Sequence, residues 1–576
     1  MTDNAGNTPT YPRSQDLIAV AGWSADTPEL AELDPSTHAG SGPRVVMLAG
    51  NNITIDARVL KAMTTVSQFG MDVVAVGLRG RGDAPEEHVG SVTIRRVLPR
   101  NRVGRAGLRG RLGRAGTGAR EVASALSPFF LRDDDRRAAL SRWELESRAL
   151  RADRGADARA AMRSEDHLPP RLSTAEKLAR AARWRRLRLR RRLLDLQSAG
   201  LRVKRRDRRV RGDGVGARRT RQLSAYRRLP ALARWEEVLP EILDQELAVG
   251  PVLDALEPDV IHVHDVFMLG IGVHAAQRAA LAGRDVKVIY DAHEFIPGVP
   301  VVAPRKLAAY AALEREFIHS ADHVITVSPS LAALLVAEHG LHRTPSVVLN
   351  APVEDRGELN VIGVREVCGL GPDVPLLVYG GGVHEARGVH TAVEALADLP
   401  GVHLVVVVKR RSYVTQDLDE RAKRIGASDR LHFAPFVPFA LVPRYLSSAT
   451  IGLSPLLRAV NHDVAITNKF CEYLNAGLPI VTSDTPEQAA LVEDLDLGAV
   501  HRADDPADLA RAVTDVLGRV EQLRTRISSD SALQTRFSWR VQAELLREVY
   551  ATLLGDLPPQ AWEPGATEVN ELLVRG

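Results

Sequence analysis

The chain has 576 residues, enough for two or three domains that each bury a hydrophobic core. Hydrophobic residues make up 45% and charged residues 26%, and no run of about 18 apolar residues occurs, so we expect neither a disordered protein nor a transmembrane helix. The net charge of +4 is uneven: residues 100–235 hold 39 lysines and arginines against 14 acidic residues, a net +25, which leaves −21 for the rest.

The N-terminal segment, residues 1–43, is polar, acidic and rich in proline, glycine and threonine. It lacks the basic start and apolar centre of a secretion signal, so we expect a flexible tail on a cytoplasmic protein. The two cysteines, Cys368 and Cys471, have no metal-ligand spacing and allow at most one disulfide, which fits a reducing compartment.

The first regular pattern is strand, loop, helix and strand. Val45–Ala49 reads as a short buried strand, and Gly50-Asn51-Asn52 leads into a helix whose apolar positions recur at Val59, Met63 and Val66. Units of this kind need a parallel sheet covered by helices. The pattern therefore predicts an α/β domain.

The alternation resumes after the basic segment. Two apolar runs, Val260–Val263 and Val286–Tyr290, flank a helical stretch, and each ends in polar residues: His264-Asp265 and Asp291-Ala292-His293-Glu294. In open parallel sheets, ligands bind at the carboxyl ends of the strands. His262 lies on the same strand face as His264 but one layer deeper, so we expect it in the core.

A second α/β pattern begins with the apolar strand Leu376–Tyr379. It runs into Gly380-Gly381-Gly382, and a helix starts near Gly388. Glycines let the backbone approach a phosphate closely, and Arg387 adds a cation with two-pronged geometry. The next strand ends in Lys409-Arg410-Arg411, which could add phosphate contacts.

The stretch 461–484 places one acid, Glu472, in an apolar helix spanning Asn468–Ala476. Gly477 stops this helix, and a short buried strand follows. We therefore expect Glu472 near the ligand-facing edge of the second sheet.

These motifs resemble those of retaining GT-B glycosyltransferases of the family 4 type, also called glycosyl transferases group 1. The stretches that carry the resemblance are "PDVIHVHD", "VIYDAHE", "ADHVITVSPS", "GGGVHEARG" and "NKFCEYLNAGLP". The family pattern has a further acid eight residues before Glu472, where this chain has Val464; Asp463 is one residue out of register.

The resemblance implies an α/β GT-B fold of two Rossmann-like domains that face a cleft. We expect an acceptor-side N-terminal domain at 44–350, interrupted by a basic, mainly helical insertion at 100–235, and a linker at 351–374. The nucleotide-sugar-binding domain then spans 375–535, and a crossover helix and tail span 536–576.

The resemblance also implies site residues for transfer of a sugar from a nucleoside diphosphate with retention of configuration. Catalytic roles fall to His264 and Arg387. The donor side comprises Gly380, Gly381, Gly382, Arg387, Lys409, Phe436, Val437, Asn468, Lys469 and Glu472, and the acceptor side Gly50, Asn51, Asp265, His293 and Glu294. Arg387, the glycine loop and a helix dipole would stabilise the departing diphosphate, so no metal or other cofactor is expected.

The basic insertion leaves three hypotheses open: binding to an anionic membrane surface, binding to nucleic acid, or a solvated insertion without a partner. We favour the membrane, on the inner face of which the enzyme would meet a lipid-linked or glycan acceptor of the cell envelope. Few aromatic residues interleave the cations for base stacking, so no nucleic acid is expected. Asp133–Asp135 reads as charge balance rather than a metal site. A sugar-nucleotide epimerase of the same fold and a basic nucleic-acid-binding protein remain as alternative functions.

Overall fold

The computed structural model describes residues 42–99 apart from 55 and 81, 234–299, 302–353, 361–409 and 411–555, together with residues 222, 223, 226 and 557. The expected N-terminal tail, almost all of the basic insertion and residues 354–360 of the expected linker lie outside the described residues. None of the helices in the described ranges combines the length and apolar character that a membrane span requires.

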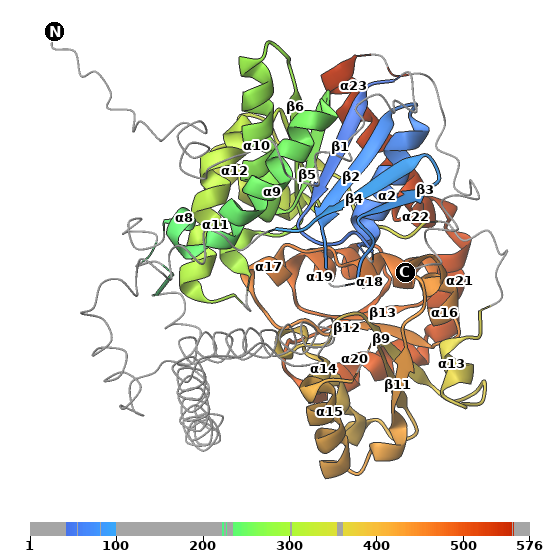
Figure 1. Cartoon of the computed structure of the whole chain (residues 1–576). Coiled ribbons are helices and arrows are strands. Elements are labelled where there is room, and N and C mark those ends of the chain that lie inside the picture. The colour runs from blue at the N-terminus through green and yellow to red at the C-terminus, as the bar shows by residue number, and fades with distance from the viewer. Residues whose placement is uncertain are drawn as a thin grey trace, which may run out of the picture. The chain divides into compact units, whose positions relative to one another are not determined.

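The first sheet has the strand order β3-β4-β2-β1-β5-β6-β7-β8. Figure 1 labels strands β1 to β6 of this sheet. Neighbouring strands are parallel except β3 and β4, which form an antiparallel hairpin around Gly90 at the edge. The strands are β1 Arg44–Ala49, β2 Asp72–Leu78, β3 Glu86–Val89, β4 Val92–Val97, β5 Val260–His264, β6 Lys287–Ala292, β7 His323–Thr326 and β8 Ser346–Val347.

Helices cover both faces of this sheet, as the near-continuous apolar strands require. The helices between its strands are α2 Ala57–Gln68, α8 Trp235–Val238, α9 Pro240–Leu256, α10 Val266–Leu281, α11 Pro304–Phe317 and α12 Pro329–His339. A Cβ on Gly272 of α10 would lie 2.5 Å from a methyl of Val263, so this glycine allows α10 to approach the sheet closely.

Strand β8 stops at Val347, three residues before the expected end of the first domain at residue 350. The amide of Val348 still donates to the carbonyl of Thr326 at 2.8 Å, but the next two backbone groups bond to side chains. The carbonyl of Val348 accepts from Nη1 of Arg58 at 2.9 Å, and the amide of Leu349 donates to Oε1 of Gln542 at 2.7 Å. The backbone leaves the sheet where it binds the α2 and C-terminal helices.

The second sheet has the order β11-β10-β9-β12-β13-β14 and is parallel throughout its paired strands. Its strands are β9 Leu376–Gly380, β10 His403–Val408, β11 Leu431–Pro435, β12 Ile451–Ser454, β13 Ile480–Ser483 and β14 Gly498–His501. The helices of this half are α13 Val364–Val367, α14 Val389–Ala395, α15 Tyr413–Arg424, α16 Val442–Leu446, α17 Val460–Asp463, α18 Asn468–Asn475, α19 Pro486–Asp494, α20 Pro506–Gly518, α21 Val520–Ser529 and α22 Ser531–Arg536. Two separate hydrophobic clusters, one on each face, show that the sheet is doubly wound. The expected class, two Rossmann-like α/β domains, is confirmed.

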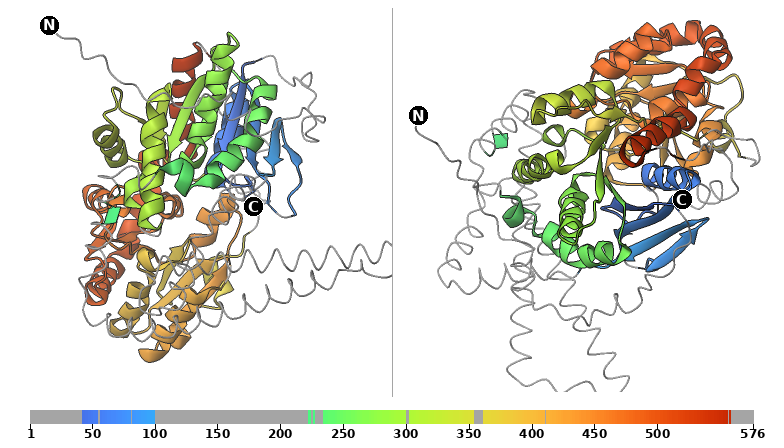
Figure 2. Two further views of the ribbon diagram at one scale, coloured as in Figure 1. Left: turned by 60° about the vertical axis from the view of Figure 1, so that its left-hand side comes forward. Right: turned by 90° about the horizontal axis from the view of Figure 1, so that it is seen from above.

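The last described helix, α23 Trp539–Leu554, returns to the first sheet and lies beside α2 (Figure 2). Its buried face supplies Trp539, Ala543, Leu546, Val549 and Tyr550 to the core beneath β1 and β2. The indole N–H of Trp539 donates to Oγ1 of Thr65 in α2 at 2.8 Å, which satisfies the polar atom of this fully buried ring.

Candidate active site

One cavity of about 780 Å³ collects the loops at the carboxyl ends of both sheets. From the first sheet it is lined by His293 and Glu294, which follow β6, and by Asp56, the N-cap of α2. The second sheet contributes the glycine loop after β9, Lys409 after β10, the segment after β11, and α18. Its size and position suit a small-molecule ligand.

Every residue expected on the donor side lines this cavity, including Phe436 and Val437. In the glycine loop, Gly381 has φ +125 and Gly388 has φ +68, values that favour glycine. A Cβ at Gly388 would lie 1.7 Å from the carbonyl oxygen of Pro455, so a side chain cannot be accommodated there without movement. The loop thus brings backbone and Arg387 to the cavity.

The two described cations of the segment after β10 differ in their surroundings. Lys409 lines the cavity, whereas Arg411 packs over the ring of Phe433 at 3.6 Å and pairs with Asp419. Arg410 lies outside the described residues.

Helix α18 supplies Asn468, Lys469 and Glu472 to the cavity. Lys469 is 7% exposed, with Nζ 5.2 Å from the ring centre of Tyr379. Burial and the neighbouring Arg387 lower the pKa of Lys469 to about 7, against the opposing effect of Glu472. Burial raises the pKa of Glu472 itself. The cavity therefore holds two neighbouring cationic side chains, Arg387 and Lys469.

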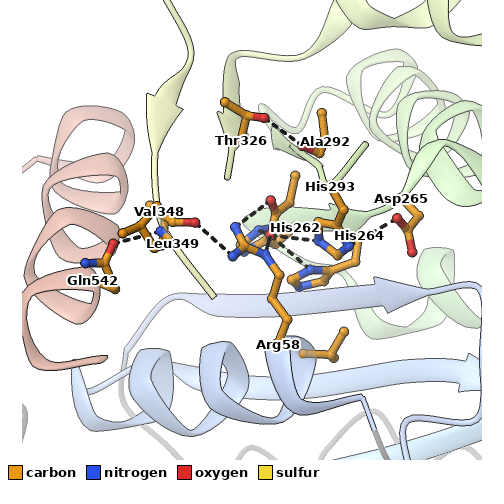
Figure 3. Close-up of polar contacts among 12 residues, drawn as sticks. Arg58, His262, His264, Asp265, Ala292, His293, Thr326, Val348, Leu349 and Gln542 are labelled. Carbon is orange, nitrogen blue, oxygen red and sulfur yellow. Dashed lines mark hydrogen bonds and ion pairs between the residues drawn. The ribbon is translucent and has the colours of Figure 1, made fainter. Parts of the chain in front are cut away.

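In the first domain, the carboxylate of Asp291 lies against residues from three elements. Figure 3 labels these residues, Arg58, His264 and His293. Arg58 of α2 donates to both of its oxygens, from Nε at 2.7 Å and Nη2 at 2.8 Å. Nδ1 of His264 and Nε2 of His293 each lie 3.2 Å from Oδ2. Although burial acts to raise the pKa of Asp291, Arg58 and His293 outweigh it and hold that pKa well below its usual range.

His293 bridges two acids, because its Nδ1 also lies 3.1 Å from Oδ1 of Asp265. Burial alone would lower the pKa of His293, but Asp265 and Asp291 raise it to about 10. Asp265 has φ +67, an unfavourable backbone conformation for a residue with a side chain, immediately after β5. His293 is thus a fixed imidazolium in the cavity wall.

His264, the expected catalytic histidine, does not line the cavity. It is 1% exposed and its ring stacks on His262 at 4.4 Å between centres, on the sheet face that α23 covers. His262 is buried as expected, with Nδ1 3.0 Å from the hydroxyl of Tyr550. Of the histidines that follow β5 and β6, His293 lines the cavity and His264 does not.

Three further residues expected on the acceptor side, Gly50, Asn51 and Asp265, are also absent from the lining. Asn51 shapes its own loop: its Oδ1 accepts from the amide of Ile53 at 2.8 Å, and its Nδ2 donates to Asp56 at 2.7 Å. A Cβ on Gly50 would lie 3.4 Å from Cβ of Phe267. Of the expected acceptor-side set, the structure brings His293 and Glu294 to the cavity.

Comparisons with known proteins agree on the class of enzyme. Residues 374–519 match the family model described as Glycosyl transferases group 1, and residues 202–355 match Glycosyltransferase Family 4. The chain is a glycosyltransferase with the GT-B fold. These matches do not favour the epimerase or nucleic-acid-binding alternatives.

Two curated relatives show which enzymes this glycosyltransferase resembles in sequence. The D-inositol 3-phosphate glycosyltransferase of Mycolicibacterium smegmatis is 25% identical over 328 residues, which cover 54% of this chain and 70% of the relative. The lipopolysaccharide core biosynthesis glycosyltransferase LpsE of Rhizobium meliloti is 25% identical over 252 residues, covering 42% and 66% of the two chains.

Among solved structures, sucrose-phosphate synthase from Thermosynechococcus elongatus superposes with a TM-score of 0.56 at 12% identity, covering 88% of this chain and 99% of that one. HepE of Anabaena in complex with UDP-glucose gives a TM-score of 0.50 at 12% identity, with coverages of 88% and 100%. These similarities establish the fold of the glycosyltransferase.

The glycosyltransferase departs from its family pattern around Val464. The carbonyl of Val464 accepts from Oγ of Ser328, and the neighbouring Asp463 pairs with Arg458 at 2.7 Å; neither Val464 nor Asp463 lines the cavity. Asn461 and His462 line it instead. Sequence reasoning missed these two, which lie just before the stretch that begins at Asn468, and also His384, which lies within the glycine-loop stretch.

One buried group in the described residues, His262, His264 and Asp291, places potential metal-ligand atoms within 4.8 Å of one another. Arg58 already donates to both oxygens of Asp291, and the imidazolium of His293 lies against the same carboxylate. A divalent ion would meet two cations there. The cluster is better suited to holding Arg58 and His293 in place than to binding metal.

Proposed function

We propose that this glycosyltransferase moves a sugar from a nucleoside diphosphate to an acceptor hydroxyl with retention of configuration and without a metal ion. The observation that carries the proposal is the convergence of Arg387, Lys469 and the glycine loop on one side of a cavity with His293 and Glu294 on the other. Cations on one wall suit a diphosphate, and an acid on the other suits a hydroxyl group.

In the proposed reaction, the bond between C1 of the sugar and the β-phosphate oxygen breaks, and its electron pair passes to the phosphate. Arg387 and protonated Lys469 stabilise this growing negative charge. The acceptor oxygen attacks C1 from the same face, and its proton passes to the departing phosphate. Glu472 accepts hydrogen bonds from the ribose hydroxyls, and the segment around Phe436 and Val437 faces the base.

Glu294 orients the acceptor hydroxyl by accepting its hydrogen bond. Its side chain is reachable from the cavity, but the surrounding protein atoms displace part of its water shell, and this desolvation together with nearby Asp265 raises its pKa. His293 keeps a positive charge beside the transferred sugar and, through Asp265 and Asp291, anchors this wall to the sheet. We assign to His293 the position that the resemblance gave to His264.

The first test is donor binding by ligand-observed NMR against UDP-, GDP- and ADP-sugars, followed by transfer or hydrolysis with the donor that binds. UDP-glucose comes first because HepE, a neighbour in fold, is known with it. The anomeric proton of the product reports retention or inversion, and activity in EDTA tests the need for a metal. An inverted product, or loss of activity in EDTA that a divalent ion restores, would contradict the proposal.

For the acceptor, we propose a lipid-linked or glycan substrate of cell-envelope synthesis, reached from the membrane surface through residues 100–235. The support is the net +25 of that segment together with the similarity to a lipopolysaccharide core enzyme. Full-length protein should sediment with anionic liposomes at low salt, and neutral liposomes serve as the control. If anionic liposomes fail to bind it, the proposed route from the membrane surface is wrong.

A further inference from the structure

The guanidinium of Arg387 is held from one side by a histidine of the same loop. Arg387 ends the short turn Glu385–Arg387 between β9 and α14. Its Nε donates to Nε2 of His384 at 3.0 Å, and its amide donates to the carbonyl of His384 at 2.9 Å. Among the described residues, no carboxylate lies within ion-pair distance of Arg387.

This contact fixes the protonation of His384. Arginine stays protonated in proteins, so Nε can only donate and Nε2 of His384 must offer a lone pair. The proton of the neutral ring then sits on Nδ1, which is buried without a partner in the described structure. Burial, followed by the charge of Arg387, lowers the pKa of His384 to about 4, so the ring is a neutral acceptor at physiological pH.

The contact also leaves the two terminal nitrogens of the guanidinium, Nη1 and Nη2, available to bind a ligand. With Nε bound to His384, Nη1 and Nη2 make no hydrogen bond within the described residues, and Arg387 lines the cavity. An unrestrained arginine samples many rotamers, whereas one held at Nε keeps the plane of its fork. Two parallel N–H groups in a fixed plane match the oxygens of a phosphate.

We propose that His384 is a positioning residue that fixes the plane of Arg387 so that its Nη atoms meet the diphosphate of the donor. This inference rests on the proposed function, because it names what holds the cation of that same site. His384 acts through Arg387 and does not itself contact the reacting atoms.

Three substitutions separate this role from a structural one. His384→Gln places an amide oxygen near the position of Nε2, His384→Asn places it near Nδ1, and His384→Phe keeps a ring of similar size without an acceptor. We expect His384→Phe and His384→Asn to lower donor turnover by about 10- to 100-fold, as small misplacements of catalytic groups do. His384→Gln should keep most of the wild-type turnover. His390→Phe, which removes a surface histidine paired with Asp504, serves as the matched control.

The decisive measurement is a double-mutant cycle on donor hydrolysis. In an Arg387→Ala background, His384→Phe should cause no further loss, because the residue that it positions is already absent. The proposal is overturned if His384→Gln hydrolyses the donor as slowly as His384→Phe does, or if His384→Phe hydrolyses it as fast as the wild type. It is also overturned if His384→Phe lowers hydrolysis by the same factor in the Arg387→Ala background. Wild-type protein that binds none of the nucleotide sugars would instead refute the proposed function. Thermal melting of each variant identifies losses that come from unfolding.

Discussion

Nucleotide binding should weaken as the pH rises above 7, and Lys469 should be the cause. Its ammonium is buried, no carboxylate lies within ion-pair distance of it in the described residues, and its pKa is about 7 in the ligand-free protein because of burial and Arg387. A diphosphate binds the charged form. Above pH 7 the protein must therefore take up a proton when the nucleotide binds.

The size of the effect follows from the fraction of Lys469 that is charged. With a pKa of about 7, roughly half is charged at pH 7 and about 1% at pH 9. The dissociation constant should rise about 50-fold between these values, on the order of 2 kcal/mol. The sign is fixed, because affinity is fully present below the pKa of ligand-free Lys469 and is lost as the pH rises through it.

Titration calorimetry with the nucleoside diphosphate of the donor, from pH 7 to 9, measures how the dissociation constant changes with pH. Repeating it in buffers of different ionisation enthalpy should show nearly one proton taken up per nucleotide at pH 8. Lys469→Met should bind the nucleotide more weakly than the wild type at pH 7, and its dissociation constant should not change with pH. Lys61→Met is the matched control, because the pKa of Lys61 is also about 7 yet its Nζ donates to the carbonyl of Ala351 and does not line the cavity. A slope that persists in Lys469→Met would refute the reasoning.

Glu472→Gln should weaken nucleotide binding by about 1–3 kcal/mol, measured by calorimetry, and should leave a dideoxyribose analogue unaffected, because only ribose hydroxyls reach the carboxylate. Arg387→Ala should reduce turnover on the order of 100-fold or more while raising the donor dissociation constant less, because the diphosphate charge grows during bond breaking; normal turnover would place the diphosphate elsewhere. Gly388→Ala should lower the melting temperature more than Gly340→Ala, since both have left-handed φ but only the first meets a backbone oxygen, with strain alone worth about 1–3 kcal/mol; equal losses would contradict the clash.

Local patterns in the sequence were sufficient for the second domain. The helix predicted from Asn468 to Ala476 spans Asn468–Asn475 with Ala476 as its C-cap, and Gly477 follows with φ +67. Strand β9 ends at Gly380, one residue beyond the prediction, and α14 begins at Val389. Each boundary depends on residues close in sequence, where glycine and apolar runs have direct conformational meaning.

The acceptor side depended on contacts that no local pattern contains. Period-two alternation correctly put His262 and His264 on one face, but the burial of His264 follows from Arg58 and Asp291, which lie 233 residues apart. The β3–β4 hairpin had a local signal, a Val89-Gly90-Ser91-Val92 turn with Gly90 at φ +56, and was overlooked. The contact between Nε2 of His384 and Nε of Arg387, on which the proposed role of His384 rests, has no local signal in the sequence either.

The return of α23 to the first sheet has a consequence for biosynthesis. The core beneath β1 and β2 includes Trp539 and Tyr550, which leave the ribosome hundreds of residues after the strands that they cover. Until then this face of the sheet is exposed to water and to other nascent chains. The N-terminal half expressed alone should aggregate, and co-expression with a segment carrying α23 should rescue its solubility. For the same reason, a premature stop codon just before Trp539 would remove a core element of the first domain although it lies beyond the last strand of the second.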